Sequence, residues 1–162
     1  KSLPLIDGLL KQESQNPYLY ELKAQVLFES GSVEASLPVY QKAVTLAPGS
    51  GLIRTAYGHA LLEAKPQTAP RTKQAVEQLE QSINNEPRIS ETHRLLAVAY
   101  GRMGDEGRSR LHLAEQYMLQ NRKDLARQEA LLAKSKLKKG SAAALRADDI
   151  LTFTAKKDKK ED

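Results

Sequence analysis

The stretch from Asn16 to Pro48, NPYLYELKAQVLFESGSVEASLPVYQKAVTLAP, decides the fold of this chain. Tyr20, Ala24 and Leu27 follow one another at intervals of four and three residues, so they share one face of a first helix. After Gly31 breaks the pattern, the same spacing returns on a second helix in Ser36, Tyr40 and Ala43. Large and small residues alternate on the two surfaces, which predicts a pair of helices that interlock closely.

This two-helix unit recurs along the chain. The second copy matches the first at Gly58, Leu61, Ala75, Leu79, Ser82 and Pro87. The third copy begins with His93, Leu96, Ala97 and Tyr100. Pro48 and Pro87 are 39 positions apart, and the excess over a 34-residue period falls in the proline-containing turn 65–70. The period and the signature resemble the tetratricopeptide repeat (TPR), which predicts an all-α solenoid of helical hairpins wound into a right-handed superhelix.

Start and stop signals divide the chain into about nine helices. We expect them at residues 3–13, 16–30, 33–46, 52–64, 70–85, 90–103, 105–120, 124–138 and 141–153. The predicted domain is one solenoid over 1–153, with repeats at 16–48, 49–87 and 88–120 and C-terminal helices at 121–153. Residues 154–162 are expected to form a disordered charged tail.

Two points of organisation stay open. The helix in 2–13 corresponds to the second helix of a repeat, so we expect a truncated repeat from a chain excised from a longer protein, with a native capping helix as the alternative. The helix at 105–120 fits as the second helix of the third repeat. It also fits as the first helix of a fourth, because Ala114 and Tyr117 repeat the spacing of Ala97 and Tyr100.

Composition excludes several kinds of chemistry. There is no cysteine, so disulfides and thiol chemistry are excluded. The sequence contains no run of about eighteen apolar residues, so no transmembrane helix is predicted. The net charge of +5 comes from residues 122–162, because residues 1–121 have equal numbers of basic and acidic residues. The basic cluster Lys134, Lys136, Lys138 and Lys139 lacks interleaved aromatic residues, which favours a solvated helix end over a nucleic-acid or lipid site.

The sequence offers no catalytic centre, metal site or cofactor site. It has three histidines, no HExxH motif and no closely spaced histidine pair. His93 falls where Tyr20 packs in the first unit, so a packing role is expected, while His112 is expected on a helix surface. His59 points away from the helix-pairing face. The carboxylate pair Asp148 and Asp149 has no partner ligands and is interpreted as surface charge.

The helix face that is not used for pairing lines the concave groove of a stacked array. The candidate groove residues are Tyr18, Glu21, Gln25, Phe28, Leu52, Thr55, His59, Leu62, Arg94, Val98 and Arg102. Among them, Phe28, Leu52, Leu62 and Val98 are expected to form an apolar strip edged by charge. Such a strip suits an extended or helical peptide, or it is covered by another part of the same protein.

One known mode of TPR binding is disfavoured. TPR modules that clamp a C-terminal carboxylate use Lys, Asn and Arg at set groove positions. In this chain those positions hold Glu21, Gln25, Ala56, Glu91 and Leu95. Two of the five are acidic and would repel a carboxylate.

Three runs extend the resemblance beyond the repeat itself. They are Leu5–Leu10 leading into Asn16–Lys23, then Ala97–Asp105, and Gly140–Ile150. Together, over about residues 3–153, they resemble the C-terminal part of bacterial HExxH zinc metallopeptidases with TPR tails, the family of the β-barrel assembly-enhancing protease.

This resemblance implies a non-catalytic docking module of a periplasmic enzyme of outer-membrane protein quality control. The zinc ligands would lie in an upstream peptidase domain, so this chain alone should be inactive. The implied partners are that domain and the outer-membrane assembly machinery. The alternatives are a free-standing TPR scaffold or assembly factor, in the cell envelope or the cytoplasm, and a nucleic-acid or membrane-surface binder that uses the basic end. The ligand and the oligomeric state stay open.

Overall fold

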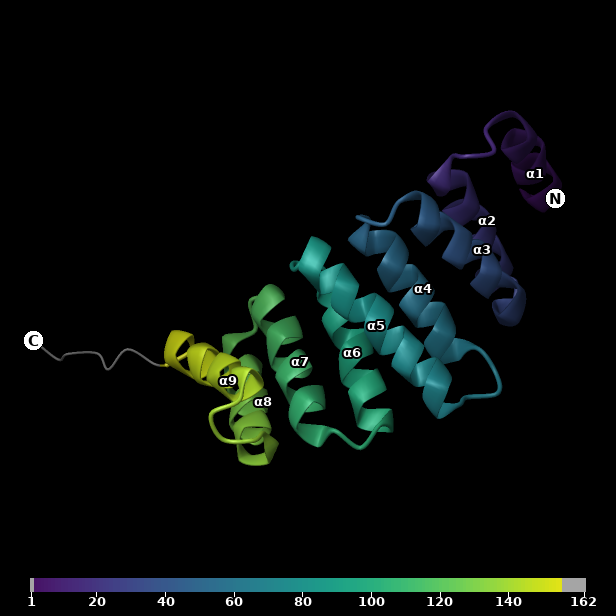
Figure 1. The fold of residues 1–162 in the computed structure, drawn as a ribbon. Helices are drawn as coiled ribbons and strands as arrows, with labels where there is room; N and C mark the ends of the chain where they lie inside the picture. Colours follow the sequence, from purple (N-terminus) through teal and green to yellow (C-terminus); the bar gives the residue numbers. More distant parts are fainter. Residues whose placement is uncertain (1, 156–162) are drawn as a thin grey trace, which may run out of the picture.

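The structure, a computed structural model, describes residues 2–155, which fold into nine α-helices without a β-strand. The helices are α1 (Ser2–Gln12), α2 (Pro17–Glu29), α3 (Val33–Leu46), α4 (Gly51–Glu63), α5 (Ala69–Asn85), α6 (Ser90–Arg102), α7 (Glu106–Leu119), α8 (Lys123–Lys136) and α9 (Ala142–Phe153). Figure 1 shows them stacked in chain order as an elongated array with the two termini at opposite ends. The all-α solenoid is therefore confirmed. The expected tail lies outside the described residues apart from 154–155.

Local signals fix the helix ends. The Asn16 side chain accepts a hydrogen bond from the Tyr18 N–H at 3.0 Å, and Pro17 occupies the first turn, where its missing N–H costs nothing. Ser50 and Ser141 cap α4 and α9 in the same way. Because these signals lie within a few residues of each end, every predicted helix matches the observed one to within two residues.

The first apolar core lies between α2 and α6. It contains the expected small residues Ala24 and Ala43 and the large residues Tyr40, Leu61 and Leu79, all buried. The closeness of α4 and α5 depends on Gly58, since a Cβ there would meet the Leu79 Cγ at 2.7 Å. The nesting of small against large side chains is thus observed.

A second apolar core joins α7, α8 and α9. Its buried members are Leu111, Ala114, Ala126, Ala130, Ala133, Ala147 and Ile150. Alanine is the commonest of these residues, so the helices are packed by close backbone approach more than by interlocking large side chains.

Three of the helix–helix turns share one geometry. Each has a residue with positive φ, at Gly31 (84°), Gly104 (78°) and Asn121 (57°). In each, the next N–H donates to a carbonyl five residues earlier, as from Arg122 to the Tyr117 oxygen at 2.8 Å. This is the Schellman motif, which ends a helix in the left-handed conformation. The α2–α3, α6–α7 and α7–α8 turns are therefore the same kind of hairpin turn.

The helix α7 has a neighbour on each side. It packs extensively against both α6 and α8, and it also contacts α9, just as α2 contacts α4 and α4 contacts α6. It therefore pairs with α6 in one hairpin and with α8 in the next. The assignment of residues 105–120 to one repeat stays a prediction.

Candidate protein-binding groove

A hollow of about 380 Å³ opens between α2 and α4, with α3 beneath it. Its lining residues are Glu21, Gln25, Phe28, Glu29, Tyr40, Ala56 and His59. Four of the predicted groove residues, Glu21, Gln25, Phe28 and His59, are thus brought together from two helices. We call this the α2–α4 hollow.

One wall of the α2–α4 hollow is aromatic. The rings of Phe28 and His59 are 5.0 Å apart between centroids and tilted by 53°. His59 Nε2 lies 4.0 Å from the Glu63 carboxylate, one turn further along α4. Both rings are only half buried, so part of this aromatic wall faces solvent.

The α2 side of the hollow, which carries Phe28, also carries two carboxylates. Burial raises the pKa of the Glu21 carboxyl, while Gln25 donates a hydrogen bond of 2.8 Å to Glu29 and so orients that carboxylate. At the base, burial first, and then the charges of Glu21 and Glu29, raise the pKa of Tyr40 to about 12. The Tyr40 phenol therefore stays protonated at neutral pH.

Tyr40 lines this hollow although its spacing predicted a different place for it. The spacing placed Tyr40 on the helix-pairing face, and its ring does stack there on Tyr57 at 6.3 Å. Its hydroxyl nevertheless reaches the hollow. The available signal was the residue type, because a phenol at a packing position needs somewhere to place its polar end.

The other predicted groove residues lie outside the α2–α4 hollow. Tyr18 and Leu52 are 66% and 59% exposed near the starts of α2 and α4. On α6, Val98 is half buried and Arg94 forms a bidentate pair with Glu91.

Leu62 corrects the sequence analysis. It was expected in the exposed apolar strip, but it is 1% exposed and belongs to the first core. The turn after α4 folds back over that helix end, where the Gln67 side chain donates to the Leu62 carbonyl at 2.6 Å. Arg102 of α6 donates to the same carbonyl at 2.7 Å. The inserted turn and α6 together close the surface that a regular repeat would leave open.

Thr55 was also expected in the groove and is buried instead. Its hydroxyl donates to the Gly51 carbonyl and lies 2.8 Å from Ser82 Oγ and 2.7 Å from Thr92 Oγ1. These hydroxyls satisfy one another where α4, α5 and α6 meet, so Thr55 has a structural role.

The histidines of α6 and α7 form a second cluster. His93 is buried, as expected, but the surface position predicted for His112 is wrong because its side chain is only 12% exposed. The Nδ1 atoms of the two rings are 3.1 Å apart, and His112 stacks on Tyr100. Helices pack on two sides of α7, so fewer of its positions face solvent. Burial, followed by the charge of His112, lowers the pKa of His93.

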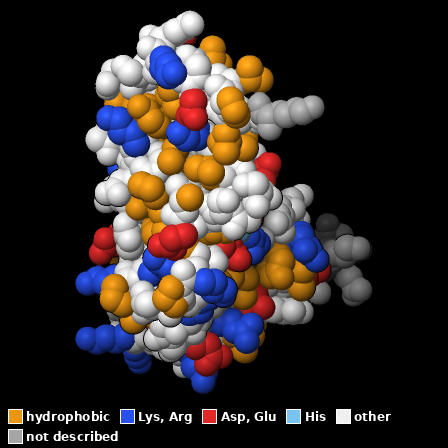
Figure 2. Space-filling model, turned by 90° about the vertical axis from the view of Figure 1, so that its right-hand side faces the viewer, with side chains coloured by type: hydrophobic (Ala, Val, Ile, Leu, Met, Phe, Trp, Pro, Cys, Tyr) orange, Lys and Arg blue, Asp and Glu red, His pale blue; other side chains and the backbone are white. Residues whose placement is uncertain are grey.

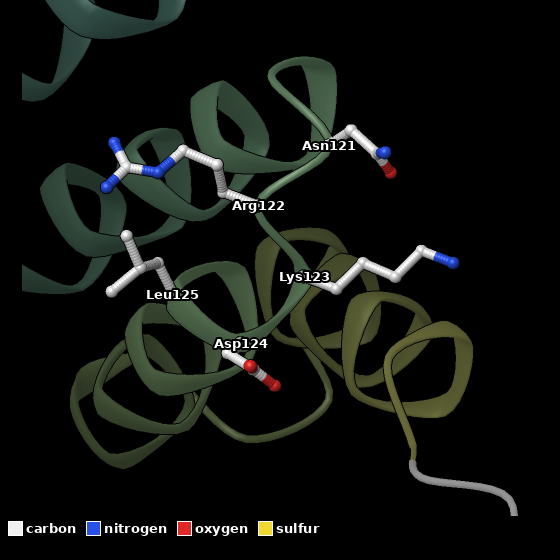
Figure 3. Close-up of a pocket in the computed structure, with 5 residues that line it drawn as sticks. All are labelled: Asn121, Arg122, Lys123, Asp124 and Leu125. Atoms are coloured by element: carbon white, nitrogen blue, oxygen red, sulfur yellow. The ribbon is translucent and has the colours of Figure 1, made fainter.

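A larger but open hollow of about 500 Å³ lies at the α7–α8 turn and is lined by residues 121–125. Figure 3 shows that these side chains point in different directions and not toward a common centre. The Arg122 guanidinium lies 5.1 Å from the Tyr117 ring, and Lys123 Nζ lies 5.0 Å from the Phe153 ring. The two cations are thus engaged with aromatic rings, and the hollow lacks the convergent polar groups of a binding site.

Charge at the C-terminal end is partly paired. Lys134 Nζ lies 2.6 Å from Asp148, and Lys136 Nζ lies 3.5 Å from Glu106. On the face seen in Figure 2, hydrophobic side chains gather in the upper half, and charged side chains are denser in the lower half.

Within residues 2–155 no helix is both long and apolar enough to span a membrane, and no group of three or more His, Cys, Asp or Glu is placed to hold a metal ion.

Known proteins match this chain in both sequence and fold. A curated relative, the inactive TPR repeat-containing thioredoxin TTL3 of Arabidopsis thaliana, is 24% identical over 74% of this chain, which spans only 17% of that protein. The crystal structure of MamA has a TM-score of 0.69 at 14% identity, covering 94% of this chain and 84% of that one. MamA from Desulfovibrio magneticus RS-1 has a TM-score of 0.66 at 16% identity, covering 94% and 81%. These structures show the fold alone.

The sequence model of the Tetratricopeptide repeat family matches residues 5–131, which is most of the chain. Paired helices, the small–large nesting and the repeated hairpin turns agree with that match. The chain therefore belongs to the tetratricopeptide repeat family and is a TPR protein-interaction domain.

Proposed function

We propose that the groove along α2, α4 and α6 docks an extended segment of a partner protein. The observation that carries the proposal is the α2–α4 hollow, where two half-buried aromatic rings lie beside polar groups that are fixed by the fold. Apolar contact with a few convergent polar groups is the usual composition of a site that binds peptides by surface complementarity. Membership of the TPR family supports the same kind of ligand.

Selection from a random peptide library on the folded protein tests this docking. Recovered peptides should lose about tenfold or more in affinity when Phe28→Lys places a positive charge on the aromatic wall, equivalent to about 1.4 kcal/mol. Leu145→Lys is the matched control, because Leu145 is 58% exposed on α9, outside the groove. Peptides that bind both variants as well as they bind the unmodified protein would place docking elsewhere and overturn the proposal.

The resemblance carries a finer version of this function. In it, the domain is the docking module of a periplasmic zinc metallopeptidase that acts in outer-membrane protein quality control, and its partners are the peptidase domain and the assembly machinery. The apolar residues Leu5 and Leu9 on the exposed face of α1 offer a surface that a peptidase domain would cover. An HExxH domain encoded before Lys1 in the same gene would support this version, and a gene without one would contradict it.

A free-standing TPR scaffold or assembly factor is the second candidate. The match to the Tetratricopeptide repeat family is equally consistent with it. In both versions the chain itself is non-catalytic. Casein incubated with the purified chain and zinc should therefore stay intact, and cleavage that a chelator abolishes would contradict this assignment.

A further inference from the structure

We propose that the α2–α4 hollow receives a basic side chain, Lys or Arg, from the docked segment. The inference rests on the proposed groove function and adds to it the chemistry of one contact. Three independent features of the hollow support it: two carboxylates that pair with no cation among residues 2–155, a buried phenol whose hydroxyl has no hydrogen-bond partner among the same residues, and an aromatic wall.

The carboxylates of Glu21 and Glu29 both line the hollow. In the part of the chain that the structure describes, neither has a Lys, Arg or His nitrogen within ion-pairing distance, whereas Glu34, Glu91 and Glu115 each pair with an arginine. Glu21 is also half buried, and burial disfavours its charged form. A cation beside Glu21 would recover the desolvation cost that the folded chain alone leaves uncompensated, and Glu29, about two turns further along α2, adds negative charge to the same hollow.

The phenol of Tyr40 gives the second indication. Tyr40 is only 3% exposed, yet within residues 2–155 its hydroxyl has no hydrogen-bond partner, and it is not sealed from solvent because it opens into the hollow. The other buried tyrosines are satisfied: Tyr57 accepts from Gln74, and Tyr100 donates to Glu80. A phenolic oxygen with free lone pairs at the base of an acidic hollow suits an ammonium or guanidinium donor.

The aromatic wall suits the remainder of such a side chain. Lys and Arg carry an apolar stem below the charged group, and that stem packs favourably on a ring such as Phe28 while the charge lies near the ring face. His59 is the neighbouring titratable group, and its Nε2 lies toward Glu63 on its own helix. An anionic side chain in the same place would meet two carboxylates, which makes the hollow selective by charge.

Titration of the folded protein with three small probes, followed by NMR of backbone amides, tests the charge preference. The probes are the N-acetyl methylamides of lysine, norleucine and glutamate, which share a backbone and differ at the side-chain end. The lysine probe should give saturable shifts at Gln25, Phe28 and His59, with an affinity about tenfold above that of the norleucine probe. The glutamate probe should give none.

Variants locate the effect. Glu21→Gln with Glu29→Gln should remove the preference for lysine over norleucine, and Tyr40→Phe, which keeps the ring, should weaken the lysine probe a few-fold. The matched control is Glu77→Gln with Asp124→Asn, which makes the same change in net charge at exposed positions outside the hollow and should leave the preference intact.

Each outcome is decisive. Equal binding of lysine and norleucine probes, the absence of saturable shifts with every probe, or a control variant that is as weakened as the Glu21 and Glu29 variant would overturn the basic-side-chain site. Library peptides that lose affinity on Phe28→Lys but show no lysine or arginine preference would overturn this inference and leave the groove function standing. A lysine probe that binds while no peptide does would overturn the groove function and leave a cation site.

Discussion

The helices before and after the α6–α7 boundary follow the same hairpin rule but fill their interiors differently. From α2 to α6 the core sets large residues such as Tyr40 and Leu79 against Ala24 and Gly58. From α7 to α9 it consists mainly of alanine. The α2–α4 hollow and the exposed aromatic wall both belong to the first region. The comparison teaches that the same hairpin turns can build a groove or a compact end, depending on the size of the side chains between the helices.

The boundary between the two regions is polar. His93 and His112 meet there, His112 Nε2 lies 3.7 Å from the Glu80 carboxylate, and Ser109 donates to the Ala97 carbonyl at 2.7 Å. Neither apolar core extends across it. The two regions are thus joined by hydrogen bonds and stacked rings.

The largest expected effect is on the free energy of unfolding, and it distinguishes a core residue of the first region from a surface residue of the second. Leu62→Glu should lower the free energy of unfolding by at least about 3 kcal/mol, because it removes a buried side chain and buries a charge. Leu145→Glu, at an exposed position of α9, should change it by less than about 0.5 kcal/mol. Urea denaturation measures both. A small loss for Leu62→Glu would return that residue to the groove.

The next prediction compares two helical glycines. Gly58→Ala should cost about 1–3 kcal/mol, because the new Cβ would lie 2.7 Å from Leu79. Gly101→Ala meets only Ser109 Oγ at 3.5 Å, so it should stabilise its helix by about 0.5–1 kcal/mol. Thermal unfolding should show a lower melting temperature for Gly58→Ala and a higher one for Gly101→Ala, if Gly58 is needed for the close packing of α4 on α5. Melting temperatures that shift in the same direction would contradict this role of Gly58.

A smaller, pH-dependent effect is expected at the polar boundary. The pKa of His93 is lower in the folded chain than its ordinary value of 6.5, so the unfolded chain binds this proton more readily. Stability should be constant above that pH and fall as the pH drops below it. Glu80 adds a further loss of stability below about pH 4.5, because the hydrogen bond with the His112 imidazole is the main cause that lowers the pKa of the Glu80 carboxyl. Urea midpoints on both sides of pH 6.5 measure the first effect, and His93→Phe should flatten it.

The smallest effect concerns the α7–α8 turn, which lies within the second region. Asn121 has a φ of 57°, a conformation that costs glycine less steric strain than any other residue. Asn121→Gly should therefore stabilise the folded chain by a few tenths of a kcal/mol. Asn121→Ala should destabilise by about 1 kcal/mol, because alanine lacks the local hydrogen bonds that let asparagine adopt this conformation. Identical melting temperatures for the two variants would count against a shared turn geometry.

The helices were predictable because their caps, glycines and prolines act locally. The repeat pairing was predictable because the small residues Ala24 and Gly58 recur at a fixed period. The burial of Leu62 was not, since it depends on Gln67 and Arg102 closing over the end of α4 from elsewhere in the chain. The burial of His112 was not predictable either, because it depends on helices from elsewhere in the chain that pack on two sides of α7.

The candidate site was predictable in part. The offset from the pairing face placed Glu21, Gln25, Phe28 and His59 on one surface, and the structure brings them together. The offset could not reveal the Tyr40 hydroxyl, because spacing describes which way a residue points and not where the far end of a long side chain emerges.

The row of first helices ends at α6, and this limits the length of a ligand that the proposed groove can bind. Along the row of first helices α2 contacts α4 and α4 contacts α6, whereas in the described part of the chain α6 does not contact α8, so a straight ligand in the proposed groove would cross three helices. Helices about 10 Å wide, and an extended chain that covers about 3.3 Å per residue, give a recognised stretch of roughly six to nine residues. Longer ligands would have to bend at the C-terminal end or leave the surface there.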